Sequence, residues 1–590
     1  MLLSTLLLLA GTPAHAGDEL EVDFGGMVQY DLRFRLNTRA MQEQYSSFFD
    51  PKPELPSISR NELITRFNAH AKMGRFGLKT SLDFVMRGYP QTEQLSDLYL
   101  YNTNAPFRFE AQEAYLYAFD LAKGFDLRIG MQKAMFGVGD QFNPTNTVTP
   151  NDLEDVLLFG DQQSNLMVRM DYNPTWNVQL TGILVPIFKP ALLPRTGFLA
   201  QNPERFPYVS DASRWTLNVE KAIADHSIDP DVAGALLRTR YPTVVGDIAV
   251  QQPEFRAENM QGFFRAGGQF GLVDVALSYY RGFSDSPQPI RTDVRQTDQP
   301  LCPNPEDELL PPEERPPECY DGQIRNDVVL GFPRMHVLGL NLSGEAGIGY
   351  RLEFGAFFPD EVRNPVYQDN ITFETAVGSI SQDGLYDFGD PDGDVVVSNT
   401  PFFKWSLGLD YTISKHVYLN TMWIHGFPDE FGAGDWLIGN AKAVRASDTT
   451  GPDGWNNCVE LNLATFDRTI DGSQCAREWY KPRINDYVVL GLDINFASQR
   501  GLLRLFTIWD VIGIYEESWN PTSGEREVIW HHLFTKDGFS AVIYPSLAWN
   551  FGNGLEVEGG ALLELGKPWS KFGSPEAGGN QLWTRARYSF

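Results

Sequence analysis

The sequence predicts an all-β fold, a transmembrane antiparallel up-and-down β-barrel of about 18 strands. Three observations lead to this prediction. Strand-like segments with alternating apolar and polar residues recur along the chain, and short and long connections alternate between them. Aromatic residues make up 13% of the chain although its mean hydropathy is negative. A barrel wall combines these properties, because lipid-facing and lumen-facing residues alternate along each strand.

Residues 1–16 have the features of a secretory signal peptide. Residues 2–10 are almost wholly apolar, and Ala14 and Ala16 form a small-x-small cleavage site before Gly17. The departure from the usual pattern is that no Lys or Arg precedes the apolar run. The run is too short to cross a bilayer as a helix. We therefore expect residues 17–590 to form a single barrel domain after cleavage.

The alternation is clearest in the first predicted strand. Val22, Phe24, Val28 and Tyr30 share one face, whereas Asp23, Gln29 and Asp31 share the other. The predicted strands are 20–36, 59–73, 75–88, 108–119, 125–135, 162–173, 176–187, 254–268, 271–283, 323–343, 347–358, 400–412, 416–426, 483–498, 501–512, 538–550, 553–565 and 580–590. Short turns are expected in the periplasm and long loops outside the cell, and an even strand count places both ends in the periplasm. The segment 323–343 needs a bulge or an early start, because Arg334 and His336 share parity with apolar residues.

Charge and cysteines narrow the class of protein. A net charge of −28 argues against nucleic acid as a partner, since such binding needs a basic surface. The four cysteines form two pairs with equal spacing, Cys302 with Cys319 and Cys458 with Cys475. In an exported protein these pairs predict two disulfides, in the loops 284–322 and 427–482. A zinc site would need closer cysteine spacing or clustered histidines.

Strand parity also predicts which charged residues line the lumen. A basic side chain facing lipid at the midplane costs about 2–4 kcal/mol, so these residues are expected to point inward. The predicted lining includes Arg33, Arg35, Arg66, Lys72, Arg169, Arg351, Arg504, Glu556, Glu558, Arg585 and Arg587. Such residues either create a field that selects polar or anionic solutes or neutralise one another and stiffen the wall. The sequence leaves both readings open.

The last predicted strand ends in Phe590, with aromatic alternation upstream. This ending resembles the C-terminal signature of outer-membrane barrels. The resemblance implies that the barrel-assembly machinery recognises this strand, and that outer-membrane lipid and lipopolysaccharide surround the protein.

Residues 124–137, GFDLRIGMQKAMFG, lead into an Asn-Pro-containing loop at 136–161. This pattern resembles porins, loosely the alginate-export and phosphate-selective porin-type barrels. In porins the third loop commonly folds into the pore. By that resemblance the constriction candidates are Asp140, Asn143, Asp152, Glu154 and Asp155. The alternative is an outer loop in which Asn-Pro merely forms a turn.

Two further loops carry predictions. The loop 188–253 is the longest and has weak helical spacing, which suggests a lid or a lumen plug. A later loop contains the calcium candidates Asp390, Asp392 and Asp394, although their spacing does not match an EF-hand. A solvated acidic turn is the alternative. No cofactor is expected otherwise, and the hydrolase, zincin and P-loop motifs are absent from the sequence, so no enzyme is predicted.

Together these features predict a porin-like channel in the outer membrane of a Gram-negative bacterium. Its expected cargo is a small polar solute, with anionic and saccharide-like solutes included. The alternatives are a transporter of hydrophobic compounds and a non-conducting barrel that binds partners at the cell surface. The sequence leaves open whether the barrel is a monomer or a trimer.

Overall fold

The structure is a computed structural model of the chain. It describes residues 20–36, 58–88, 107–155, 160–193, 243–297, 306–311, 314, 316, 323–368, 372–375, 378–381, 394–432, 444–445, 459–461, 468–470, 478–520, 525–567, 569–573 and 580–590. Several predictions lie outside these residues: the signal peptide 1–16, the four cysteines, Asp390 and Asp392, and most of the loop 188–253.

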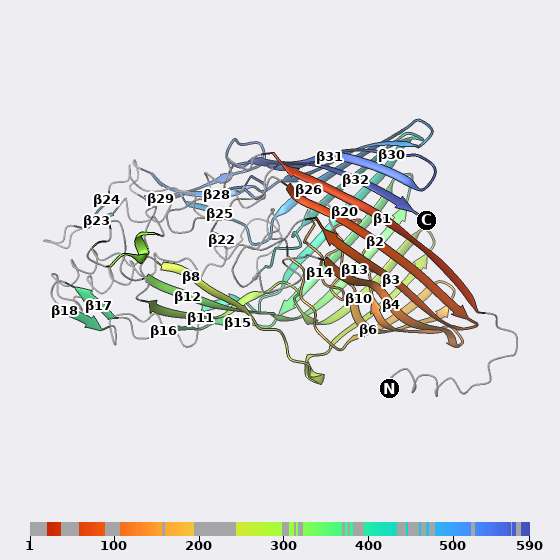
Figure 1. The fold of residues 1–590 in the computed structure, drawn as a ribbon, viewed down its shortest axis with the longest axis horizontal. Coiled ribbons are helices and arrows are strands. Elements are labelled where there is room, and N and C mark those ends of the chain that lie inside the picture. Colours follow the sequence, from red (N-terminus) through yellow and green to blue (C-terminus); the bar gives the residue numbers. More distant parts are fainter. Residues whose placement is uncertain are drawn as a thin grey trace.

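Eighteen strands form one closed antiparallel barrel, as the sequence predicted (Figure 1). Each strand pairs with the next barrel strand along the chain, which is the up-and-down arrangement. In this order the strands are β1 (Glu21–Arg35), β2 (Ile58–Met73), β3 (Phe76–Arg87), β4 (Phe107–Ala122), β5 (Phe125–Gln132), β6 (Asn165–Thr175), β7 (Val178–Val185), β9 (Gln261–Phe270), β10 (Val273–Phe283), β13 (Arg334–Glu345), β14 (Gly349–Pro359), β20 (Phe402–Ser414), β21 (Val417–His425), β26 (Asp486–Phe496), β27 (Gly501–Asp510), β30 (Ser540–Asn550), β31 (Leu555–Gly566) and β32 (Gln581–Ser589).

The barrel closes where β1 pairs with β32. The register runs from Met27 opposite Ser589 to Arg35 opposite Gln581. Closure leaves no free edge in the wall, so every wall strand has two hydrogen-bonded neighbours. It also brings Asp31 beside Arg585, two charged residues from opposite ends of the sequence.

The strand ends differ in the length of their connections. The turns β2–β3, β4–β5, β6–β7 and β9–β10 are short, as are β13–β14, β20–β21, β26–β27 and β30–β31. They gather at the right-hand end of the barrel in Figure 1, where β32 also ends. The long connections leave from the opposite end. This segregation is typical of outer-membrane barrels, whose short turns face the periplasm.

Alternation along the strands separates an apolar exterior from a polar lumen. In β1 the side chains of Phe24 and Phe34 are 81% and 42% exposed on the outside. Their neighbours Asp31 and Arg33 are buried inside, at 2% and 3% exposed. The same period of two recurs around the wall because successive side chains of a strand point to opposite faces. The outer surface is therefore suited to lipid and the inner one to water and polar side chains.

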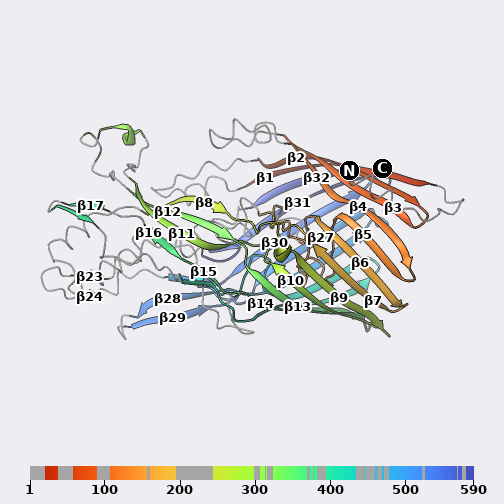
Figure 2. The ribbon, with the colours of Figure 1, turned by 90° about the horizontal axis from the view of Figure 1, so that it is seen from below.

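Shorter strands continue from the barrel on the long-loop side (Figures 1 and 2). The hairpin of β11 and β12 prolongs β10 and β13, and β28 with β29 prolongs β27 and β30. These outer elements are β8 (Thr243–Val250), β11 (Gln288–Thr297), β12 (Gln323–Gly331), β15 (Val362–Asn364), β16 (Val366–Gln368), β17 (Thr372–Thr375), β18 (Gly378–Ser381), β19 (Asp394–Val397), β22 (Val444–Arg445), β23 (Val459–Leu461), β24 (Arg468–Ile470), β25 (Glu478–Lys481), β28 (Ile514–Asn520), β29 (Glu525–His531) and the short 3-10 helices η3 (Ala257–Asn259) and η4 (Asp307–Leu309).

One predicted strand is wrong as drawn. The segment 323–343 is not a single wall strand but two strands, β12 outside the barrel and β13 within it. The break falls at Phe332 and Pro333, where proline has no N–H to donate to a sheet. The two strands have different partners, because β12 pairs with β11 and β8 whereas β13 pairs with β10 and β14. Arg334 and His336 keep the outward face of Leu338, at the long-loop end of β13.

None of the helices in the described part of the chain is long and apolar enough to cross a bilayer. Inside the barrel, toward its long-loop end, buried apolar residues form two clusters. One includes Phe142, Phe427, Tyr487 and Phe572, and the other includes Phe263, Phe357 and Phe402. The lumen is thus partly filled by packed side chains from loops.

Candidate functional site

The loop 136–161 begins against the wall formed by β13 and β14. Glu353 of β14, which is fully buried, accepts hydrogen bonds from the backbone N–H groups of Val138 (2.9 Å), Gly139 (3.3 Å) and Thr145 (2.8 Å). The Thr145 hydroxyl also donates to Glu353, at 2.7 Å. One carboxylate thus satisfies four donors, which fixes the first part of the loop because a buried carboxylate left unpaired is costly.

The later part of the loop is held by β1, β2 and β3. Arg33 binds both oxygens of Asp155 at 2.6 Å, and Arg60 and Arg87 donate to Glu154 at 2.7 and 2.8 Å. These arginines come from the side of the barrel away from β13 and β14 in strand order. The loop therefore crosses the lumen and is fastened at both walls.

Between these anchors the loop places Asp140 and Phe142 inside the barrel. The carboxylate of Asp140 forms an ion pair with Arg351 and accepts a hydrogen bond from Asn420, at 2.7 Å. The ring of Phe142 packs 5.2 Å from that of Phe427. The middle of the loop thus contacts both charged and aromatic groups.

The carboxylates of the loop have different environments. Burial alone would raise the pKa of Glu154, but Arg60 and Arg87 hold it below its usual range. Asp152 forms no ion pair with an arginine or lysine of the described residues. Burial, followed by repulsion from Asp161 and Glu154, raises the pKa of Asp152 to about 6. Glu154 is therefore a fixed negative charge, whereas Asp152 titrates near pH 6.

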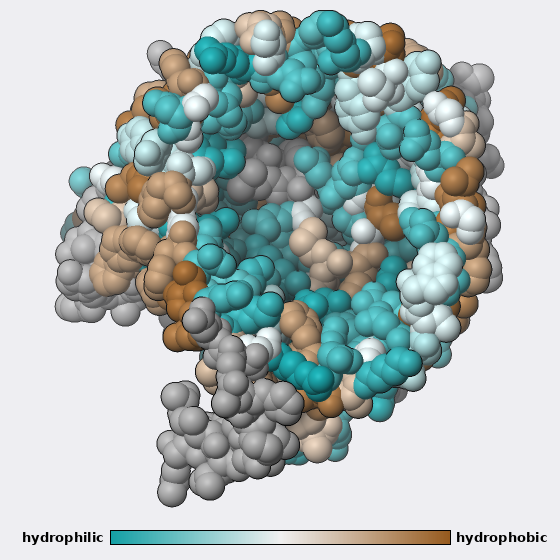
Figure 3. Space-filling view, turned by 90° about the vertical axis from the view of Figure 1, so that its right-hand side faces the viewer, coloured by the Kyte–Doolittle hydropathy of each residue, from teal (hydrophilic) through white to brown (hydrophobic). Residues whose placement is uncertain are grey.

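Two cavities lie on either side of the loop. The larger has a volume of about 590 Å³ and the smaller about 90 Å³. Both are lined by Gln141, Phe142 and Gly160, so these residues separate them. Gly160 has φ +79°, a conformation that favours glycine, and a Cβ there would press on the Gln141 backbone. Figure 3, which faces the short-turn end, shows the barrel hollowed and lined mostly by hydrophilic residues.

The larger cavity has a mixed lining. Four carboxylates, those of Asp140, Asp161, Asp493 and Glu558, face two guanidiniums, those of Arg504 and Arg585. Arg504 holds Asp493 through bonds of 2.8 and 2.7 Å, and Arg585 binds Asp31 at 2.9 Å. The lining also includes Tyr418, Asn420, Met422, Phe506 and Tyr544. The cavity therefore combines charged groups of both signs with apolar side chains.

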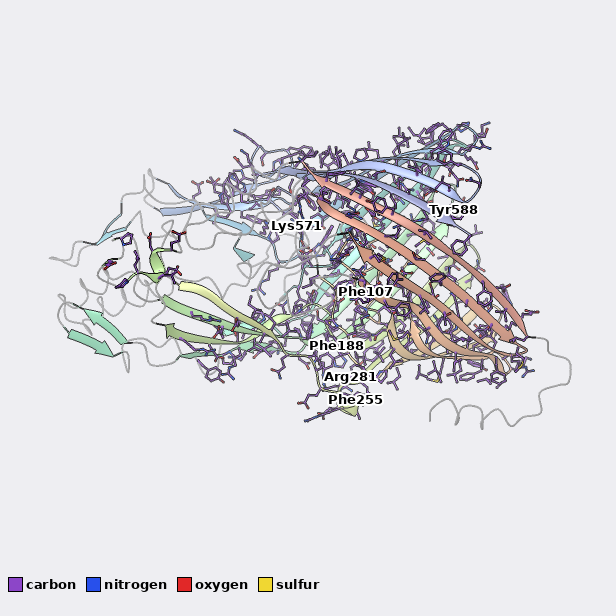
Figure 4. The ribbon with its side chains drawn as sticks, viewed as in Figure 1. Phe107, Phe188, Phe255, Arg281, Lys571 and Tyr588 are labelled. Carbon is purple, nitrogen blue, oxygen red and sulfur yellow. The ribbon has the colours of Figure 1, made fainter. Side chains whose placement is uncertain are left out.

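A second ionic group lies beyond the loop, nearer the long-loop end. Lys571, which follows β31, contacts both oxygens of Asp429 at 2.8 and 2.9 Å and Glu430 at 3.3 Å. The Tyr487 hydroxyl also donates to Glu430. Phe427 and Phe572 pack in the adjacent apolar cluster. This arrangement joins two loops over the lumen (Figure 4 labels Lys571).

The predicted lining residues lie as follows. Most of the basic candidates form ion pairs with carboxylates. The pairs are Arg66 with Asp83, Arg169 with Asp171, Arg33 and Arg585 with Asp31, and Arg351 with Asp140 and Asp410. Arg587 donates to Gln29 at 2.9 Å and is the register partner of Glu556. Arg35 is the register partner of Gln581 at the closure of the barrel. Lys72 is exposed near the short-turn end, and Glu558 forms no side-chain bond to another described residue.

Of the five constriction candidates, Asp140 lines the larger cavity and Asn143 the smaller one. Asp152 accepts the N–H of Glu154 at 3.2 Å, while Glu154 and Asp155 serve as anchors. The loop residues that parity and motif reasoning missed are Gln141, Phe142 and Gly160. No charge or motif marks them, so only the three-dimensional path of the loop identifies them.

No metal centre is evident in the described residues, where no three His, Cys, Asp or Glu side chains are arranged to hold an ion. Of the calcium candidates, Asp394 starts β19 and the other two lie outside those residues. The predicted disulfides stay predictions for the same reason.

No protein-family model matches the chain, and no curated protein does. Solved structures similar to it include OccAB3 of Acinetobacter baumannii, with a TM-score of 0.41 and 9% identity over 97% of this chain and 99% of that one. OccK9 (OpdG) of Pseudomonas aeruginosa has a TM-score of 0.39 and 10% identity over 97% and 98%. A BenF-like porin from Pseudomonas fluorescens Pf-5 has a TM-score of 0.37 and 8% identity over 97% and 98%.

Proposed function

We propose that this chain is an outer-membrane channel that passes small polar solutes through a lumen narrowed by the loop 136–161. The observation that carries the proposal is the cavity of about 590 Å³ beside that loop, which carboxylates and guanidiniums line together with apolar side chains. A barrel whose interior served only as a packed core would have no need of a charged, hollow lumen. The apolar exterior and the segregated turns support the outer-membrane location.

The charges of the lining support polar solutes more than anions alone. The sequence suggested anions because many basic residues share the lumen face. In the structure, however, Arg33, Arg66 and Arg504 each bind a carboxylate. The cavity lining has two more carboxylates than guanidiniums. We therefore expect weak ion selectivity and transport of neutral polar solutes, with saccharide-like compounds as the first to test.

Single-channel recording of the refolded protein in a planar bilayer tests this proposal. We expect steady conductance and a small reversal potential in a salt gradient. The E558Q variant removes a carboxylate that forms no hydrogen bond or ion pair with a described residue, so it should shift selectivity toward anions. E113Q is a matched control, because Glu113 binds Lys79 away from the cavity. A bilayer that stays sealed, with folding verified by circular dichroism, would overturn the channel.

A second function is favoured by the strands that project beyond the barrel. The four-stranded sheet β16-β11-β12-β8 and the sheet β22-β25-β28-β29 extend the molecule on the long-loop side (Figure 2). Such extensions offer a binding surface that an open pore does not require. Blocking the lumen distinguishes the two functions. Intact cells that carry a surface-binding barrel would still bind its ligand, whereas cells that carry a channel would lose uptake of the solute.

A further inference from the structure

Arg281 lies on the outer face of the barrel wall. In β10 the side chains of Leu277 and Tyr279 are 61% and 40% exposed, and Arg281 continues their face. The alternate residues Ala276 and Tyr280 are buried inside, at 4% and 2%. Figure 4 shows Arg281 where the barrel meets its projecting strands.

This orientation is exceptional within the wall. In the barrel strands that the structure describes, the other lysines and arginines share the lumen-facing alternation, apart from Arg334 at the first position of β13. A basic residue on the lipid face is tolerated only near an interface, since its cost falls from about 2–4 kcal/mol at the midplane to about 0–1 kcal/mol there. Arg281 must therefore lie near the edge of the apolar band.

Its distance along β10 agrees with this. Arg281 is eight residues from Val273, at the short-turn end of the strand. At roughly 3.3 Å per residue the strand rises about 26 Å over that stretch. A tilt of about 40° reduces this to about 20 Å along the membrane normal, close to the height of about 25 Å of an outward apolar band. Arg281 thus lies at the outer-leaflet edge.

Among the described residues, Arg281 has an unpaired imidazole nitrogen beside it and no carboxylate partner. Its register partner on β13 is His336, on the same face. His336 Nδ1 hydrogen-bonds the Tyr279 hydroxyl at 2.7 Å, which leaves Nε2 without a bond to any described residue. Arg281 likewise forms no ion pair with a described residue. A guanidinium beside an imidazole forms a fork suited to a phosphate.

Apolar side chains border this pair of residues. Phe264 and Leu338, on the adjacent strands, are 51% and 50% exposed. Phe255, in the segment before η3, is 70% exposed. Arg334 donates to Asn259 at 2.7 Å and so holds that segment on the barrel. A free phosphate would use only the polar groups, whereas a phospholipid would also cover these apolar ones.

We propose that Arg281 and His336 bind the phosphate of an anionic outer-leaflet lipid, with Tyr279 orienting the imidazole and with the acyl chains of the lipid against Phe264 and Leu338. The chemical class is a phosphorylated glycolipid such as lipid A. This inference depends on the barrel standing in a membrane and not on whether its lumen conducts.

Native mass spectrometry of the full protein in detergent provides the test. Lipid A is added with its phosphates intact or after enzymatic removal of both. We expect R281Q to bind intact lipid A about tenfold more weakly than the wild type, because a bidentate charge-assisted contact is lost. R75Q is the matched control, since Arg75 is exposed in a turn at the opposite end of the barrel and should leave binding unchanged.

Dephosphorylated lipid A should bind the wild type and R281Q equally, and weakly. Equal binding of intact and dephosphorylated lipid A to the wild type would overturn the proposal, as would unchanged binding by R281Q. The heat-dependent electrophoretic shift of each variant verifies that its barrel is folded. Single-channel conductance should be the same in R281Q as in the wild type, so failure of this proposal is distinguishable from failure of the channel.

Discussion

Arg33 of β1 donates two hydrogen bonds of 2.6 Å to Asp155, one to each carboxylate oxygen. Both side chains are buried, and Arg33 also binds Asp31 beside it in the wall. Asp31 in turn accepts a bond from Arg585 across the closure of the barrel. The loop that crosses the lumen is therefore tied directly to the place where the wall closes.

Removing the charge of Asp155 should release this end of the loop. We expect D155N to lower the free energy of unfolding by about 2 kcal/mol, because a buried guanidinium loses one of its two carboxylate partners. Thermal unfolding followed by circular dichroism measures the loss. D161N is the control, since the Lys133–Asp161 pair is partly exposed and worth about 0–1 kcal/mol. Equal stability of D155N and wild type would contradict the role of Asp155 as an anchor.

Substitution of Glu353, the anchor at the opposite wall, should lower the free energy of unfolding more than D155N does. Glu353 accepts four bonds from the loop, so E353A leaves buried N–H groups unsatisfied and should cost about 3 kcal/mol or more. E353Q keeps one oxygen and should fall between E353A and wild type. The open-channel current of E353A should also become noisier as the loop moves. E556A, near the short-turn end, is the control. If it lowers the free energy of unfolding as much as E353A does, the effect of E353A is not specific to the loop.

Phe142 separates the two cavities, and its removal should join them. F142A is expected to increase single-channel conductance severalfold while lowering stability by about 3 kcal/mol through the cavity left behind. F142L, which keeps most of the volume, should retain the conductance of the wild type. Unchanged conductance in a folded F142A would show that solutes do not pass between Gln141, Phe142 and Gly160.

Asp152 should make the stability of the protein depend on pH. Its pKa is about 6 in the folded chain and about 3.9 in an unfolded one, so ionisation is disfavoured by folding. The unfolded state then binds fewer protons than the folded state between pH 4 and 6, and stability falls as the pH rises through that window. D152N mimics the protonated form and keeps the acceptor for Glu154 N–H.

We therefore expect D152N to unfold at a higher temperature than wild type above pH 6 and at nearly the same temperature at pH 4. Melting curves of both proteins at pH 4, 5, 6 and 7.5 measure this. A difference that stays constant over the whole range would show that Asp152 does not titrate in the folded protein.

The wall of the barrel could be predicted from the sequence because its pattern is local. Phe34 and Arg33 are adjacent, and their opposite orientations follow from the period of two alone. The prediction of a single strand at 323–343 was wrong, because the change of strand partners depends on β8 and β11, which the local pattern does not contain.

The candidate site was only partly predictable. Asp155 was chosen by resemblance to porins, but its partner Arg33 lies 122 residues away, and no periodicity links the two. Phe142 carries no charge and matches no motif, so its position between two cavities follows only from the folded path of the loop. Charged residues of a barrel can be identified as lumen-facing from the sequence, whereas an apolar side chain that narrows a passage resembles any other core residue.

The closure between β1 and β32 determines how this protein must assemble. Asp31 and Arg585 are 554 residues apart, and bringing such distant segments together costs roughly 6 kcal/mol of chain entropy, which later bonds must offset. Neighbouring hairpins can form first, so this join is expected to come last. Until then β1 and β32 are unpaired edge strands, which can pair with other chains and aggregate. Any side chain larger than glycine at Gly26 would collide with Arg66 and Phe590, so such a substitution would prolong the vulnerable stage and lower the yield of folded protein.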